Sequence, residues 1–312
     1  MKKIIAMLLV LVMSVTGLVG CGSSKGNEAG STSASSDSDW AYIQDKGKLT
    51  VGITLFAPMN YYNEKNKLVG FDTEMAEAVT KKLGIDVEFT EINWDSKEVE
   101  LSSKNIDCIW NGFTINGRED DYTWSDPYLN NEQVMVVASD SGIETLADLA
   151  GKNVVVQAAS AALDALNSDD NKDLTDSFAS LTENPDYNTA FMNIDSGAAD
   201  AVAVDIGVAK YQLAQREEGK YKILDEPIQS EQYGIGFAKG NEELRDTVWA
   251  EVMKLYDEGE IDKLAEQYGV ADMLCLGDEE AADKTEENTD AAEENADSDE
   301  AADADAAEDE AE

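Results

Sequence analysis

The stretch FDTEMAEAVTKKLGIDVEFTEI, residues 71–92, predicts a helix that is followed at once by a strand. Apolar residues recur at helical spacing through Met75 and Leu83, and Gly84 is placed to end the helix. After it, apolar and polar residues alternate up to Ile92, which is the pattern of a strand with one buried face. A helix that leads directly into a strand is a unit of an α/β fold.

The segments around this unit repeat the same alternation of strand and helix. Residues 48–55 predict an apolar strand before it, and residues 93–103 and 106–113 predict a short helix and another strand after it. The order strand, helix, strand, helix, strand indicates parallel strands that are joined by crossover helices.

A second α/β unit follows later in the chain. Its expected strands are Asn153–Gln157 and a segment that ends at Asp205, and a helix is expected to begin near Ser160. The strands NNEQVMVVA (130–138) and QYGIGFAKG (232–240) are the expected connections to this unit and back. Two units that are joined by two strands form a hinge with a cleft between them.

The N-terminal residues 1–20 predict a secretory signal peptide, because Lys2 and Lys3 precede an apolar run too short to span a bilayer. The segment ends in Leu-Val-Gly-Cys, which resembles the lipobox of bacterial lipoproteins, whose cysteine carries the lipid after cleavage. We therefore expect lipid on Cys21 and a flexible Gly/Ser-rich tether at 21–39. The alternative is an ordinary secretory signal with a chance cysteine.

The C-terminal segment is strongly acidic. Residues 278–312 carry 18 carboxylates and one lysine in an alanine-rich background. They bury too little apolar surface to offset the entropy of ordering, so we expect a disordered tail; a partner-binding segment is the alternative. The whole chain has 66 acidic and 23 basic side chains, with a formal net charge of −43. This charge argues against a nucleic-acid partner.

Histidine is absent from the sequence. Its absence excludes Ser-His-Asp and Cys-His catalysis and histidine-based zinc sites, and nothing else in the sequence predicts a metal or a cofactor. Besides Cys21, the cysteines are Cys108 and Cys275. They could pair in an oxidising compartment, but Cys108 stands in an apolar run and is also compatible with a buried thiol.

Several motifs occur in order between Leu49 and Gly269: GFDTEMAEAVTKKLG, NGFTINGRED, WSDPYLNNEQVMVVA, GAADAVAVD and LYDEGEIDKLAEQYG. Together they resemble the extracellular solute-binding proteins that supply polar amino acids to ABC importers. The resemblance implies an α/β, two-lobed periplasmic-binding-protein-like (Venus flytrap) fold with two hinge strands. Under it we expect lobe 1 at 40–132 and 230–277, and lobe 2 at 133–229.

The resemblance implies a binding role for a group of residues in lobe 1. Arg118 stands where family members grip the α-carboxylate of the ligand, and a guanidinium suits bidentate pairing and keeps its charge. The turn before it contains Asn111, Gly112 and Thr114, the implied source of backbone and hydroxyl donors to the same carboxylate. The interval between Thr114 and Arg118 is one residue shorter than is usual in the family.

Further roles fall on both lobes. Asp205 matches the strand-end aspartate that binds the α-ammonium. Ser160, at the start of a helix, matches a companion donor near the ligand carboxylate. Trp94 and Tyr61 fall on the aromatic wall that contacts the ligand side chain. Thr54 takes the place of an aspartate that many members have, which argues against a cationic ligand.

Three of these residues also have an ordinary structural interpretation. Arg118 could form a surface pair with a neighbouring acid, Glu119 or Asp120. Asp205 could cap the helix that follows it, and Trp94 could be part of the core.

The resemblance implies a receptor that binds a free amino acid and delivers it to an ABC permease. It would act as a monomer, held by its lipid at the extracellular face of the cell membrane, with no enzyme activity and no cofactor. Two alternatives remain. One is an enzyme of the carbon–oxygen lyase type on the same fold, with an acid such as Glu98 as its base. The other is a ligand sensor without transport.

Overall fold

The structure is a computed structural model that describes residues 38–277. Its strands are β1 (Lys48–Ile53), β2 (Tyr61–Tyr62), β3 (Leu68–Val69), β4 (Asp86–Glu91), β5 (Cys108–Thr114), β6 (Thr123–Trp124), β7 (Leu129–Ala138), β8 (Asn153–Gln157), β9 (Ser180–Asn184), β10 (Ala201–Asp205), β11 (Tyr221–Ile223) and β12 (Gln229–Phe237). Its α-helices are α1 (Asp39–Lys46), α2 (Phe71–Leu83), α3 (Lys97–Ser102), α4 (Ala161–Asn167), α5 (Lys172–Asp176), α6 (Tyr187–Asp195), α7 (Ile206–Ala214), α8 (Glu242–Asp257) and α9 (Glu260–Tyr268).

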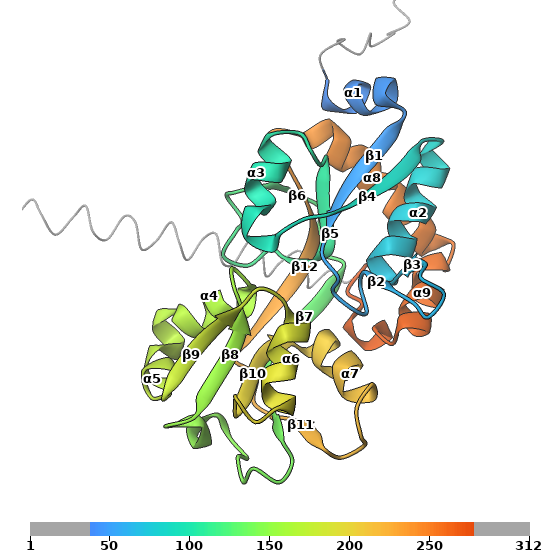
Figure 1. The fold of residues 1–312 in the computed structure, drawn as a ribbon. Helices are drawn as coiled ribbons and strands as arrows, with labels where there is room; N and C mark the ends of the chain where they lie inside the picture. The colour runs from blue at the N-terminus through green and yellow to red at the C-terminus, as the bar shows by residue number, and fades with distance from the viewer. Residues whose placement is uncertain (1–37, 278–312) are drawn as a thin grey trace, which may run out of the picture. The chain divides into compact units, whose positions relative to one another are not determined.

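Lobe 1 is built around the parallel strands β4, β1 and β5, with α2 and α3 on opposite sides (Figure 1). The helix α2 is capped at its C-terminus by Gly84, whose backbone lies in the left-handed region. The helix buries Phe71, Met75 and Val79. Complete burial of a large apolar side chain contributes about 1.5–3 kcal/mol. The amphipathic pattern therefore fixes α2 against the sheet, and the predicted helix–strand unit is confirmed.

Lobe 2 is built around the parallel strands β10, β8 and β9. Successive residues of β10 pack on opposite faces of the sheet, as the alternation of side chains in a strand requires. Val204 belongs to a buried cluster with Phe191 of α6, and Ala203 belongs to another with Leu166 of α4. Both faces of these strands are thus covered by helices, which explains their continuous apolar character.

Two antiparallel strands, β7 and β12, join the lobes (Figure 1). β7 also pairs with β10 of lobe 2, and β12 also pairs with β5 of lobe 1. The main sheet therefore has the order β4-β1-β5-β12-β7-β10-β8-β9. This confirms the two-lobed α/β fold with two hinge strands. The expected lobe boundaries, 132/133 and 229/230, fall within the hinge strands and stay predictions.

The described part of the chain begins with a helix. The helix α1 starts at Asp39, with the Ser38 hydroxyl accepting a hydrogen bond from Ala41 N. Asp39 also accepts a hydrogen bond from Leu244 N over 3.2 Å. The expected tether at 21–39 stays a prediction, and its last residue is the first residue of α1. The predicted signal peptide, Cys21 and the acidic tail lie outside the described residues.

Cys108 is a buried thiol at the start of β5 and forms no disulfide, as one of the two interpretations expected. Burial raises the pKa of this thiol well above its usual range. Within residues 38–277, no helix has both the length and the apolar character needed to cross a bilayer.

Candidate ligand-binding site

Residues that end or follow parallel strands of both lobes line one pocket. Thr114 ends β5, Gln157 ends β8 and Asp205 ends β10. In open α/β sheets, ligands bind outside the carboxyl ends of the strands. The pocket has a volume of about 20 Å³. Its lining consists of Thr54, Phe56, Trp94, Asn111, Gly112, Thr114, Arg118, Gln157, Ser160, Ala161, Tyr187 and Asp205.

All but one of the predicted ligand-binding residues line this pocket. The exception is Tyr61, whose short strand β2 pairs with β3. Its ring centroid lies 5.2 Å from that of Tyr211 and 6.4 Å from that of Tyr268. Tyr61 thus packs between α7 and α9 and does not share this pocket with Trp94, and its contact with a ligand stays a prediction.

Arg118 reaches across to lobe 2. Its Nη2 lies 2.6 Å from Asp164 Oδ2, and its Nη1 donates to Thr114 O over 3.4 Å. The Arg118 side chain is 10% exposed and that of Asp164 is 64% exposed, so water screens the pair and it contributes about 0–1 kcal/mol. A guanidinium has five N–H donors. Further donors of Arg118 are thus available for a ligand carboxylate.

Asp205 is buried among four donors. Its Oδ1 accepts from Asn131 Nδ2 (2.9 Å), Gln133 Nε2 (2.7 Å) and Tyr233 Oη (2.5 Å). Its Oδ2 accepts from Tyr187 Oη over 3.1 Å. Burial raises the pKa of Asp205, and the hydrogen bonds oppose this. The side chain makes no capping hydrogen bond to α7, so its position reflects the pocket rather than the helix.

The donors expected from the turn at the end of β5 have internal partners. Gly112 N donates to Asp72 Oδ2 over 2.6 Å, and Thr114 Oγ1 donates to Glu231 Oε1 over 2.9 Å. The side-chain amide of Asn111 bonds to the loop that follows β1. These groups line the pocket and have internal partners in the ligand-free protein, and their donation to a ligand carboxylate stays a prediction.

Position 112 requires a glycine. Its φ is +53°, in the left-handed region, and a Cβ at this position would lie 2.7 Å from the ring of Phe56. The same Cβ would approach the ring of Tyr233 to 3.1 Å. The close approach of two aromatic rings to the backbone therefore explains the glycine.

Glu231 is a buried acid that the sequence reasoning missed. It is 3% exposed, and its Oε1 accepts from Thr114, Asn131 and Gln133. Burial, and then the charge of Asp205, raise the pKa of Glu231 to about 7. The sequence carried no clear signal for it, because residues 130–133 of β7 and 229–232 of β12 are polar at every position and do not show which face is buried.

Trp94 lies between this pocket and a larger chamber of about 530 Å³. Its indole N–H donates to Ala159 O over 3.0 Å, and its ring packs edge-on against Phe113 at 5.3 Å. Trp94 is thus partly a packing residue and partly a wall of the site. Ser160 caps α4, since its hydroxyl accepts from Leu163 N and donates to Gln157 O.

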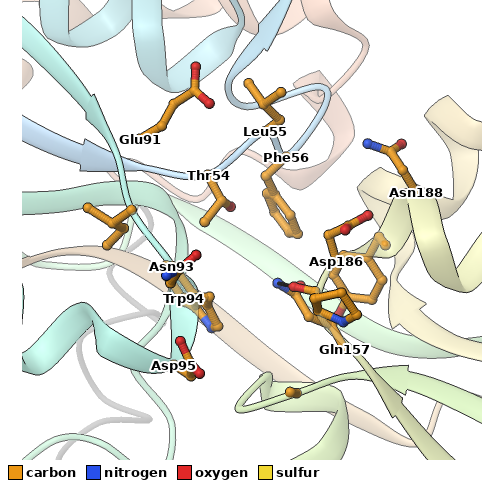
Figure 2. Close-up of a pocket in the computed structure, with 14 residues that line it drawn as sticks. Thr54, Leu55, Phe56, Glu91, Asn93, Trp94, Asp95, Gln157, Asp186 and Asn188 are labelled. Atoms are coloured by element: carbon orange, nitrogen blue, oxygen red, sulfur yellow. Dashed lines mark hydrogen bonds between the residues drawn. The ribbon is translucent and has the colours of Figure 1, made fainter.

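The chamber lies between the two lobes. Figure 2 shows Thr54, Phe56 and Trp94 on one side and Gln157, Asp186 and Asn188 on the other. Three carboxylates line the chamber: Glu91, Asp95 and Asp186. No lysine or arginine is among its described lining residues. The sequence reasoning missed these acids, although Glu91 ends β4 and Asp186 follows β9, the strand ends where ligands are expected.

Two further points concern a possible catalytic base and possible metal ligands. Glu98, the acid considered as a base, lies on α3 beside Tyr122 and lines neither the pocket nor the chamber. In the part of the chain that the structure describes, no cluster of Cys, Asp and Glu is suited to hold a metal ion.

Residues 49–271 match the bacterial extracellular solute-binding proteins, family 3. The chain belongs to this family. Among similar proteins of the family, the L-cystine-binding protein TcyA of Bacillus subtilis is 31% identical over 273 residues. That alignment covers 86% of this chain and 97% of TcyA.

Solved structures also resemble this solute-binding protein. One is an ABC uptake transporter substrate-binding protein from Streptococcus pneumoniae with bound histidine. It has 28% identity and a TM-score of 0.72, with coverage of 75% of this chain and 97% of that one. Another is the ancestral amino acid-binding protein AncCDT-1, a precursor of cyclohexadienyl dehydratase. It has 27% identity and a TM-score of 0.67, with coverage of 74% and 99%.

Proposed function

We propose that this solute-binding protein is a receptor that binds a free amino acid between its lobes and delivers it to an ABC importer. The observation that carries the proposal is that one pocket is lined by a positive side chain of lobe 1, Arg118, and a negative side chain of lobe 2, Asp205. A zwitterion brings one carboxylate and one ammonium, and each needs a charged partner in a site that excludes water. The names of the relatives, which include binding proteins for cystine and glutamine, support the same class of ligand.

Binding requires motion in this proposal. The pocket around Arg118 and Asp205 has a volume of about 20 Å³, close to the space that one water molecule needs. The head group of an amino acid is larger, so the lobes must separate to admit it. They close again because the ligand contacts both lobes at once.

The chamber next to Trp94 is suited to the side chain of the ligand. Its lining contains three carboxylates, Glu91, Asp95 and Asp186, and no lysine or arginine that would compensate their negative charge. Neutral polar and cationic side chains are therefore favoured over acidic ones. This reverses the inference drawn from Thr54, because other positions supply negative charge.

A thermal-shift screen of the 20 amino acids and L-cystine tests the function. A ligand at 100 times its Kd stabilises a protein by about 2.7 kcal/mol, which corresponds to a rise in Tm of roughly 5–10 °C for a chain of this size. We expect such a rise with a neutral polar or cationic amino acid and the smallest shifts with L-aspartate and L-glutamate. A flat response to the whole panel would refute the amino-acid receptor.

The same panel addresses the alternatives. AncCDT-1 is described as a precursor of a dehydratase, so incubation with prephenate-like acids and product analysis is the matching test for a lyase. The proposal expects no product with any of these acids. A sensor would bind the amino acid in the same way but would not support its uptake by cells.

The proposed location is the extracellular face of the membrane, with lipid on Cys21. We expect Cys21→Ser to move the protein from the membrane pellet to the supernatant, because the lipid would be its attachment. Amino-acid affinity should stay unchanged, since the folded residues are the same. Cys108→Ala, which removes the cysteine sulfur of β5 without burying a hydroxyl, is the control and should stay in the pellet. Sedimentation of Cys21→Ser with the membranes would contradict the anchor.

A further inference from the structure

Two buried carboxylates at the hinge share the same donors. Asn131 Nδ2 donates to Asp205 Oδ1 (2.9 Å) and to Glu231 Oε1 (2.7 Å). Gln133 Nε2 donates to both of these oxygens over 2.7 Å. Within residues 38–277, neither acid forms an ion pair with a lysine or an arginine. Two carboxylates that are buried this close cannot both ionise without cost, so the pair is expected to hold one proton.

The proton belongs on Glu231. Both oxygens of Asp205 accept hydrogen bonds, whereas Glu231 Oε2 is buried without a hydrogen-bond partner. The carbonyl oxygens of the two bridging amides, Asn131 Oδ1 and Gln133 Oε1, are buried and lack donors as well. A proton on Glu231 Oε2 would add a donor to a cluster in which these three buried oxygens have no hydrogen-bond partner.

The other groups that face the pair do not compete for this role. The hydroxyls of Tyr187 and Tyr233 donate to Asp205, and burial raises the pKa of each tyrosine well above its usual range. Thr114 donates to Glu231. Arg118 lines the same pocket as Asp205 and is its cation. Glu231, with its unpartnered Oε2, is therefore the group of this cluster on which the geometry places the shared proton.

We propose that Glu231 is a positioning residue of the ammonium site, which holds a proton in the ligand-free protein and releases it to solvent when the ligand ammonium reaches Asp205. This inference rests on the proposed function. The ammonium would offset the negative charge of Asp205, which is the charge that disfavours ionisation of Glu231. Ionised Glu231 would then add a second negative charge behind the ammonium.

The sign of the pH dependence follows from the release of the proton. If binding lowers the pKa of Glu231 from about 7 by one to two units, affinity rises as pH rises through this range. We expect Kd to be about five- to tenfold lower at pH 8 than at pH 6. The free energy of unfolding of the ligand-free protein should fall, whereas affinity rises, as pH rises. The folded state keeps the proton up to about pH 7 whereas unfolded Glu loses it near 4.5, so stability is lost across this window as pH rises.

Calorimetry of the full chain with L-arginine, L-glutamine and L-cystine tests the inference. Titrations in buffers of different ionisation enthalpy should show release of a fraction of a proton at pH 7. The variant Glu231→Gln imitates the protonated form, so it should bind about two- to tenfold more weakly than the wild type at pH 6 and about ten- to one-hundredfold more weakly at pH 8. It should release no proton. The matched control is Glu132→Gln, a half-exposed acid between the two bridging amides, which should behave as the wild type.

A second measurement does not depend on the ligand or on the variant being well folded. Carbon-13 NMR of glutamate-labelled, ligand-free protein should show one side-chain carboxyl that titrates near pH 7. Titration of every glutamate near its usual pKa would overturn the proton on Glu231. A Kd that is constant between pH 6 and 8 would overturn the coupling. If none of the three probes binds, the amino acid that gives the largest thermal shift takes their place. A flat response to the whole panel would overturn the proposed function and the coupling together, while the NMR titration would still report on the proton.

Discussion

Asp205→Ala is expected to remove measurable amino-acid binding in calorimetry. The carboxylate lines the pocket opposite Arg118 and is the proposed partner of the ligand ammonium. A hydrogen bond to a charged group contributes about 1.5–3 kcal/mol, and a charge left unpaired in a closed site costs more. The loss in affinity should therefore be on the order of 100-fold or larger.

Stability controls are needed because Asp205 is also a structural acceptor. Alanine would leave the buried hydroxyls of Tyr187 and Tyr233 without this acceptor, at a cost of about 1–3 kcal/mol each. Asp205→Asn keeps the shape and one acceptor, and should fold but still fail to bind. Asp225→Asn, an exposed acid before β12, is the matched control and should bind normally. Wild-type affinity in Asp205→Asn would show that the ammonium binds elsewhere.

Arg118→Ala should have an effect of similar size. The guanidinium is the proposed partner of the ligand carboxylate, and its contacts with Asp164 and Thr114 leave further donors available. Loss of a bidentate, charged pair in a closed site should weaken binding on the order of 100-fold. Arg118→Lys should also bind poorly, since an ammonium cannot reproduce the planar fork. Calorimetry on the folded variants gives the answer.

Two further variants separate the ligand role of Arg118 from its ion pair. Asp164→Asn removes the partner across the cleft but leaves the guanidinium, so its affinity should stay within a few-fold of the wild type. Arg245→Ala removes an arginine of α8 that bonds to Asp246 and Trp124 O, and it should bind normally. If Asp164→Asn were as defective as Arg118→Ala, the interlobe ion pair rather than the ligand contact would account for the loss.

Local patterns predicted the elements of the fold well. The bounds of α2 and β8 follow directly from helical spacing, a stop glycine and a short apolar run, because each is decided within a few neighbouring residues. The strand-end position of Asp205 was visible for the same reason. Such signals are local, and local signals can be read from a single sequence.

What the sequence did not reveal depends on tertiary contacts. Glu231 is buried only because β12 lies between β5 and β7, so that polar residues of neighbouring strands meet on one face. The packing of Tyr61 between α7 and α9 was not predicted, because an aromatic residue in a loop does not indicate which elements its ring will contact. The internal acceptors of Gly112 and Thr114, Asp72 and Glu231, were not predicted because they lie far away in the sequence.

The antiparallel hinge also has a consequence for the order in which the chain can fold. The segments that lead into and out of lobe 2 lie next to each other, since Ala138 of β7 pairs with Tyr221 of β11. The parallel strands of lobe 2 and their helices come from one continuous stretch, and its contacts close short loops. In lobe 1, Thr114 of β5 pairs with Tyr233 of β12, which is synthesised more than one hundred residues later. Long loops cost more entropy to close, so lobe 2 can assemble while lobe 1 still lacks its last strand and the helix α8.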